Sequence, residues 1–300
     1  MATTAPFRLR SRTREDAPIA ARLSHLLRLW HLTSLDAPTV AVTWTLAIAA
    51  AFRIYLPLWL PITLALAAWS AYIADRLLDV YRARPHPLIE NTLRPRHLFH
   101  WRHRRLFIPI AAAAAAAALT LVFINMPTAA RARNSILAAA TLVYFTSIHN
   151  PWQPALPKLR IPKELFVALI FTLACAIPAW TRIPAQRTEL VLPTLIFIAL
   201  AWLNCHAIEL WESETSFVQR HKLLPAAAAL AISALAAATL TFITGQPRIA
   251  ALEAAAALSA TFLTLLNRHH NRLHPTTLRA AADLVLLTPL ALVALQLSTS

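Results

Sequence analysis

Two carboxylates end a long apolar run in the stretch "AYIADRLLDV", residues 71–80. Asp75 and Asp79 stand four residues apart, so a helix places both side chains on one face. Adjacent carboxylates repel each other and resist removal from water beside a bilayer. Mg²⁺ relieves both costs, and it commonly takes one or two protein carboxylates together with phosphate oxygens of a substrate. The pair is therefore a candidate catalytic Mg²⁺ site that faces a diphosphate, and the alternative is ion pairing with neighbouring arginines.

A second group of polar residues closes a later apolar segment, in "LNCHAIELWESE". Glu209 and Glu212 stand three residues apart and share a helix face, so they are candidates for a second metal ion. Asn204 and His206 lie about one turn earlier. Their amide and imidazole groups could coordinate a metal or bind phosphate.

Basic residues lie close to both carboxylate pairs along the chain. Arg84 follows the first pair, and "YFTSIHNPWQPALPKLRIPKELFVALIF" supplies Tyr144, Lys158 and Lys163. Fixed cations aimed at a departing diphosphate stabilise the charge that develops on it. These side chains are candidates for contact with an anionic group of a substrate.

The elements that position these residues are long apolar helices. Hydrophobic residues make up 58% of the 300 residues and charged residues only 14%, which excludes an ordinary soluble domain. Apolar runs of about 20 residues, the length that crosses a bilayer core, recur along the chain. The sequence predicts an all-α polytopic membrane protein with nine spans, at 37–55, 57–78, 105–126, 129–148, 162–181, 189–211, 223–244, 248–266 and 276–297.

The placement of Lys and Arg predicts the orientation of these spans. Most of the 28 basic residues fall in the N-terminal segment and in alternate loops, which puts the N-terminus inside and the C-terminus outside. The formal net charge of +15 then reflects topology, and no nucleic-acid partner is expected. Residues 1–35 are expected to be a cytosolic or interfacial segment and 36–300 a single transmembrane domain. Within the first segment, residues 19–34 fit either an interfacial helix or an extension of the first span.

With these motifs the chain resembles the UbiA superfamily of intramembrane prenyltransferases over roughly residues 37–297. That family has nine helices, in two four-helix halves plus a ninth, with Asp-rich motifs at the inner ends of helices two and six. Asp75 and Asp79 match the last two acids of the first motif. The second motif is replaced by the segment that holds Glu209 and Glu212.

The resemblance implies a function and a set of partners. It implies Mg²⁺-dependent transfer of a prenyl group from an isoprenyl diphosphate to a small, aromatic acceptor within the membrane. Asp75 and Asp79 would bind Mg²⁺, Glu209 and Glu212 a second ion, and Lys158 and Lys163 the leaving group. Arginine- and alanine-rich composition favours a bacterial inner membrane as the location.

Two other functions are compatible with the sequence. Histidines recur as HxxHxxH at residues 97–103 and as HHxxxH at residues 269–274, which could indicate a His-ligated membrane metal oxidase or hydroxylase. The incomplete Asp-rich motifs would equally suit a membrane protein that binds a prenyl diphosphate or a lipid without turning it over.

Overall fold

Helices make up all the regular structure in the part of the chain that the computed structural model describes, namely residues 16–83, 93–149, 162–212 and 217–299. The predicted all-α class is confirmed over these residues. The helices are α1 (Asp16–Leu32), α2 (Asp36–Ala51), α3 (Trp59–Ala83), α5 (Pro95–Arg102), α6 (Arg104–Asn125), α7 (Thr128–His149), α8 (Lys163–Trp180), α9 (Arg187–Glu212), α10 (Phe217–Ile243), α11 (Pro247–His269), η1 (His270–Arg272), α12 (Pro275–Leu284), η2 (Val285–Leu287) and α13 (Leu290–Thr299).

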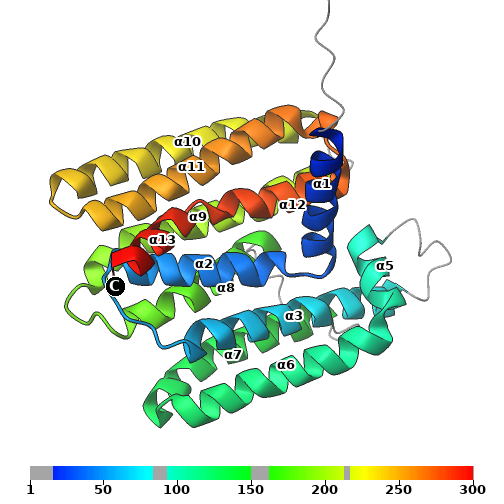
Figure 1. The fold of residues 1–300 in the computed structure, drawn as a ribbon, viewed down its shortest axis with the longest axis horizontal. Coiled ribbons are helices and arrows are strands. Elements are labelled where there is room, and N and C mark those ends of the chain that lie inside the picture. Colours follow the sequence, from blue (N-terminus) through cyan, green and yellow to red (C-terminus); the bar gives the residue numbers. More distant parts are fainter. Residues whose placement is uncertain (1–15, 84–92, 150–161, 213–216, 300) are drawn as a thin grey trace, which may run out of the picture.

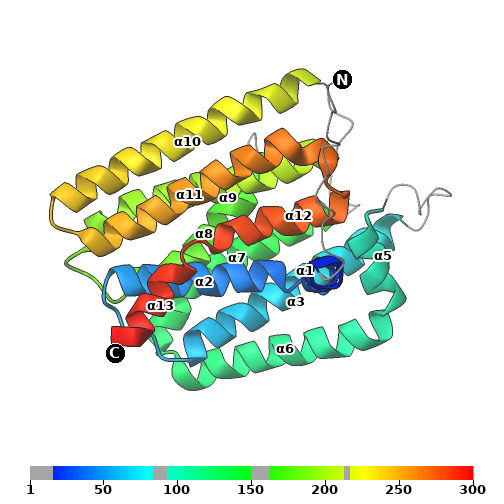
Figure 2. The same cartoon turned by 45° about the horizontal axis from the view of Figure 1, so that its top comes forward.

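The long helices lie side by side in one bundle, and successive helices run in opposite directions (Figures 1 and 2). Helices α1 and α5 lie at one end of the bundle, which we call the α1 end, and the other end is called the opposite end. Five helices within the described residues are long and apolar enough to cross a membrane, or six if the bent pair α1–α2 is one span. Helix length and composition therefore support an integral membrane protein. The five are Arg104–Asn125, Lys163–Trp180, Arg187–Glu212, Leu223–Ile243 and Pro247–Arg272.

Helix boundaries follow from local backbone chemistry. Pro95, Pro247 and Pro275 occupy the first turns of α5, α11 and α12, where a missing N–H costs nothing. The single glycine of the chain, Gly245, follows α10 with φ 84°. Glycine adopts this left-handed conformation without strain, so the chain can turn tightly into α11.

Small side chains allow the helices to approach closely. Helix α10 packs against α11 along most of its length, and its buried face carries Ala227, Ala234 and Ala238. Alanine takes the role that glycine has in many membrane helix pairs. The largest buried side chain, Trp44 of α2, stacks on Phe197 of α9 with ring centroids 3.8 Å apart.

The last predicted span, 276–297, is not one continuous helix. It divides into α12, η2 and α13, because Pro289 has no N–H and its ring clashes with the carbonyl of Val285 four residues earlier. The carbonyls at the break gain partners from other helices. Ser259 donates to the Val285 oxygen at 2.7 Å, and Trp44 Nε1 donates to the Leu286 oxygen at 2.9 Å.

Helix α1 meets α2 at an angle of 88°. Figure 1 shows α1 running across the end of the bundle, at right angles to the long helices. The sequence left two interpretations of residues 19–34, and this angle favours an interfacial helix over an extension of the first span.

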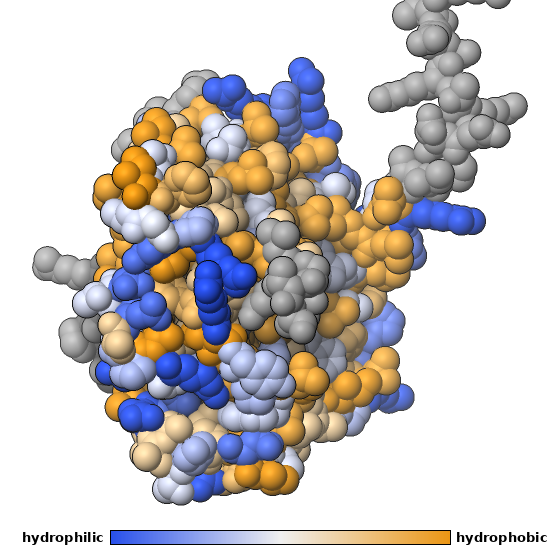
Figure 3. Space-filling view, turned by 60° about the vertical axis from the view of Figure 1, so that its left-hand side comes forward, coloured by the Kyte–Doolittle hydropathy of each residue, from blue (hydrophilic) through white to orange (hydrophobic). Residues whose placement is uncertain are grey.

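The opposite end carries its own exposed cations. Figure 3 shows hydrophilic side chains gathered on this end among apolar flanks. Arg53, Arg133, Arg182 and Arg187, at the ends of α2, α7, α8 and α9, are exposed. Both ends of the bundle are therefore polar, as expected of helices that cross a bilayer.

Candidate functional site

Polar side chains from six helices converge at the α1 end. We call this group the polar end cluster. Its members come from α1, α2, α3, α5, α9 and α12, and most of them are buried or half-buried. They are His31, Asp36, Arg76, Arg94, Arg96, His97, His100, Asn204, Glu209, Glu212, Arg279 and Asp283.

One pair of residues from the polar end cluster stabilises the bend between α1 and α2. His31 Nδ1 donates to Asp36 Oδ2 at 2.6 Å, and both side chains are nearly fully buried. The other carboxylate oxygen of Asp36 accepts the Ala37 N–H at 2.9 Å. This places a negative charge at the first turn of α2, where the helix dipole stabilises it.

Arg76 of α3 lies at the centre of the cluster. Its side chain is 2% exposed, and its guanidinium lies over the Tyr72 ring, 5.3 Å from the ring centroid. The negative charge of Asp36 acts on Arg76. No ion pair joins Arg76 to a carboxylate in the described part of the chain, and its Nε has no hydrogen-bond partner there. A buried charge of this kind is costly unless something compensates it.

Two histidines of α5 are buried beside these cations. Burial lowers the pKa of His97 to about 3, and the positive charge of Arg96 acts in the same direction. Burial also lowers the pKa of His100 to about 4. Neutral His100 donates from Nδ1 to the Arg96 carbonyl at 2.8 Å, so Nε2 accepts from the Ser34 hydroxyl at 3.1 Å.

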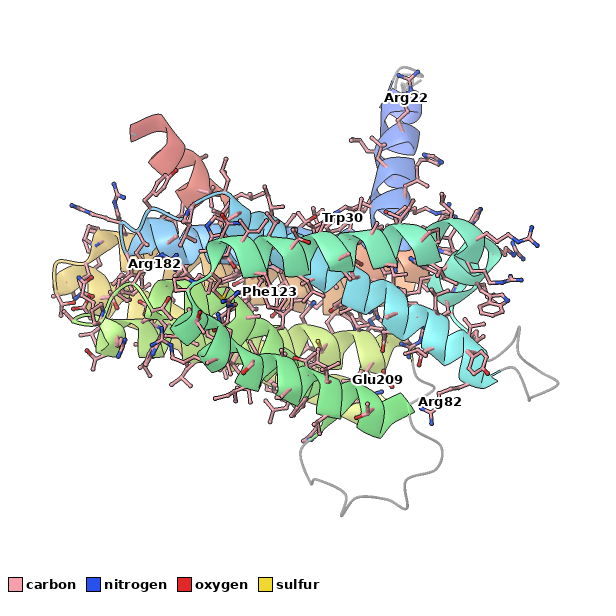
Figure 4. All side chains as sticks on the ribbon, turned by 90° about the horizontal axis from the view of Figure 1, so that it is seen from below. Arg22, Trp30, Arg82, Phe123, Arg182 and Glu209 are labelled. Atoms are coloured by element: carbon pink, nitrogen blue, oxygen red, sulfur yellow. The ribbon has the colours of Figure 1, made fainter. Side chains whose placement is uncertain are left out.

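Ion pairs join α5, α9 and α12. Glu212 contacts Arg94, Arg96 at 2.9 Å and Arg279 at 3.2 Å. Glu209, labelled in Figure 4, contacts Arg94 at 3.4 Å and Lys163 at 3.5 Å. Four cations thus surround two carboxylates, which brings the starts of α5 and α8 and part of α12 against the end of α9.

The edge of the cluster opens to solvent. A hollow of about 200 Å³ lies between α9, η1 and α12, and Glu212, Arg279, Trp211 and Leu278 are among its lining residues. Water and small anions can therefore reach the ion pairs of Glu212 from outside the bundle.

The first predicted carboxylate pair lies on a half-buried face of α3. The buried face of α3 carries Ile73, Arg76 and Val80, and Asp75 and Asp79, four residues apart, are half-buried together on a neighbouring face of the helix. Asp79 Oδ2 lies 3.5 Å from His97 Nε2. Since burial keeps His97 neutral, this is a contact between a carboxylate and an uncharged imidazole rather than an ion pair.

The other predicted site residues are divided between the cluster and its surroundings. Asn204 is in the cluster and donates from Nδ2 to Asp283 Oδ1 at 3.1 Å. His206 is half-buried and stacks on Trp202. Lys163 is 59% exposed at the start of α8. Arg84, Lys158 and the side chain of Tyr144 lie outside what the structure describes.

One set of side chains has the spacing of metal ligands. Among the described residues, the only group of three or more His, Cys, Asp or Glu with ligand atoms mutually within 4.8 Å is His31, Asp36 and Asp283. The positive charges of Arg76 and Arg279 act on Asp36, and Asp283 accepts a hydrogen bond from Asn204. The two histidine motifs do not converge. His103 and His270 donate from Nδ1 to backbone carbonyls of their own segments.

Sequence reasoning singled out Asn204, Glu209 and Glu212 of the cluster but gave no role to His31 and Asp36. It singled out Asp75 and Asp79 by their spacing and took Arg76 only as a possible ion-pair partner. A signal for Arg76 exists, since it lies on the same helix face as Ile73 and Val80, three and four residues away. No comparable local signal marks His31 and Asp36, which meet only because the chain bends between them.

Known proteins give no further guide to the site. Comparisons with protein-family models, curated proteins and solved structures found no match. The site must be interpreted from its own geometry.

The buried histidines predict a pH dependence of stability. His97 and His100 bind protons near pH 6.5 when unfolded but only near pH 3 to 4 when folded. Their contribution is fully present above pH 6.5 and is lost as the pH falls, by about 1.4 kcal/mol per pH unit for each histidine. The free energy of unfolding in detergent, measured between about pH 5 and 7, should show this slope. His97→Gln should reduce it, and an unchanged slope in that variant would contradict the assignment.

Proposed function

We propose that the protein binds an isoprenyl diphosphate at the polar end cluster and transfers the prenyl group to a small, aromatic acceptor within the membrane. The observation that carries the proposal is Arg76, a buried guanidinium without an ion-paired carboxylate in the described residues. It follows Asp75 directly in the sequence and lies on the buried face of α3, next to the face that carries Asp75 and Asp79, at the polar end of an apolar bundle. A diphosphate would compensate its charge, and the prenyl chain would lie among the helices.

The nine-span arrangement of the UbiA type is part of this proposal. Helices α2, α3, α6 and α7 would form one half, α8 to α11 the other half, and α12 with α13 the ninth span. The α1 end would face the cytoplasm of a bacterium, with the C-terminus outside. The resemblance of the α3 motif to that family supports this assignment.

Magnesium fits one of the two carboxylate pairs. Asp75 and Asp79 are half-buried beside a neutral imidazole, and two carboxylates with phosphate oxygens suit Mg²⁺. Glu209 and Glu212 do not fit, because four basic side chains already contact them. When bound, Mg²⁺ would neutralise charge that develops on the diphosphate. Arg76 would hold the leaving group, and the apolar helices would exclude water from the allylic carbon.

Binding without turnover is a second candidate, and one observation favours it. The carboxylates that replace the second Asp-rich motif form ion pairs with arginines, so this arrangement does not offer the second of the two metal sites that the family resemblance implies. A protein with this site could hold or present a prenyl diphosphate without breaking its C–O bond. Release of diphosphate over time distinguishes the two candidates.

The test is thermal melting of the detergent-purified protein with geranylgeranyl diphosphate, in Mg²⁺ and in EDTA. A ligand at about 100 times its Kd adds about 2.7 kcal/mol to stability and raises the melting temperature. We expect a Mg²⁺-dependent rise that Asp75→Asn with Asp79→Asn abolishes. Glu189→Gln, at the opposite end, is the control and should keep the rise. Absence of any shift with prenyl diphosphates of several lengths would refute the proposal.

A further inference from the structure

Helix α1 projects sideways from the bundle. It stands at 88° to α2, and Figure 4 shows its first turns, with Arg22 labelled, well away from the other helices. If α2 runs along the membrane normal, α1 lies parallel to the membrane surface. This direction leaves most of α1 outside the bundle.

The free part of α1 has two unlike faces. Leu23 and Leu26 are exposed by 62% and 61% and lie on one side of the helix. Arg22, His25 and Arg28 are also exposed; His25 and Arg28 lie toward the other side, and Arg22, four residues before Leu26, borders the leucines. An exposed apolar stripe beside cations is the pattern of helices that lie in the membrane interface.

The orientation of α1 is fixed by its last turn. Besides the His31–Asp36 bond, Trp69 of α3 donates to the Thr33 carbonyl at 2.9 Å, and Trp30 donates to Thr39 at 3.2 Å. Because three helices hold the bend, the exposed leucines cannot fold back onto the bundle. They therefore stay open to a surface outside the described residues.

We propose that α1 binds the surface of an anionic lipid bilayer, with Leu23 and Leu26 in the acyl boundary and Arg22 and Arg28 at the headgroups. The positive charge at the α1 end of the bundle determines which partner binds α1. Arg102 and Arg105, at the neighbouring α5–α6 junction, are exposed too, and the whole chain carries +15. A second copy would bring the same charge to this surface and be repelled, whereas anionic headgroups attract it. This inference does not depend on the proposed function.

Spin labels test the two faces in full-length protein. In a Cys175→Ala, Cys205→Ala background, the label is placed by Leu23→Cys or by His25→Cys, and the protein is reconstituted in phosphatidylcholine nanodiscs containing phosphatidylglycerol. Collision rates with oxygen report the acyl region, and those with a soluble nickel complex report water. We expect oxygen to dominate at position 23, at a depth of about 5–10 Å, and nickel to dominate at position 25. Nickel dominance at both positions would overturn the proposal. Protection of position 23 from both reagents would do so as well, because it would indicate a protein partner.

The cations are tested in the same system. Arg22→Gln with Arg28→Gln should lower the ratio of surface-bound to dissociated α1 about fivefold for each arginine, and only when phosphatidylglycerol is present. Arg182→Gln with Arg187→Gln, at the opposite end, is the matched control and should leave the ratio unchanged. An equal loss in both double variants would overturn the assignment of these arginines.

Discussion

Replacing Glu212 with glutamine is expected to lower the free energy of unfolding by about 3 kcal/mol or more. Glu212 contacts Arg94, Arg96 and Arg279, and its side chain is only 16% exposed. Glutamine has nearly the same shape but no charge, so among the described residues Arg96 and Arg279 lose their ion-paired carboxylate and Arg94 keeps only Glu209. Removing one partner of a buried ion pair lowers stability far more than replacing both partners with apolar residues, because the remaining charge stays desolvated.

Glu209→Gln is the matched control. Glu209 is 36% exposed, and its contacts with Arg94 and Lys163 are 3.4 and 3.5 Å long. Exposed pairs contribute no more than about 1 kcal/mol, so this variant should remain close to the wild type. Both variants are compared by reversible unfolding in mixed detergent. Equal losses at the two positions would show that Glu212 is not the centre of the ion-pair network.

Arg76→Met should raise the Kd for geranylgeranyl diphosphate about 30-fold or more, since a buried charge contact to a ligand contributes about 2 kcal/mol at least. Methionine follows the path of the arginine stem but carries no charge. Stability should suffer less than in Glu212→Gln, because Arg76 has no ion-paired carboxylate among the described residues. The measurement is Kd from ligand titration, with melting of the ligand-free protein in parallel.

Arg76→Lys separates charge from geometry. Lysine keeps the positive charge but loses the planar fork that binds two phosphate oxygens together. We expect a smaller rise in Kd than with methionine. If Arg76→Met leaves Kd unchanged, or destabilises the free protein as much as Glu212→Gln, then Arg76 has a structural role and the proposed diphosphate site is wrong.

The helical architecture was accessible from the sequence because long apolar runs have few alternatives in a bilayer. Spans were placed within a few residues of α6, α9 and α11, whose ends are marked by charged residues, by prolines or by Gly245. The last span was drawn as continuous although Pro289 was visible. A single proline does not reveal whether neighbouring side chains will satisfy the carbonyls that it frees.

The site was only partly accessible, because its contacts join distant parts of the chain. Spacing placed Asp75 and Asp79 on one helix face, but it could not tell that α3 would turn Arg76 inward. Arg279 and Glu212 are 67 residues apart, and nothing local at either position indicates the other. The role of diphosphate and prenyl group remains a proposal that the two variants above address.

The broken last segment has a consequence for biogenesis. Carbonyls freed at Val285 and Leu286 accept from Ser259 of α11 and Trp44 of α2, and an unsatisfied carbonyl in hydrocarbon costs several kcal/mol. The segment from α12 to α13 is therefore poorly suited to enter lipid by itself. Both donors precede it in the chain, so they are already in the membrane when it leaves the ribosome. The Val285 and Leu286 carbonyls are therefore synthesised after the helices that carry their hydrogen-bond donors.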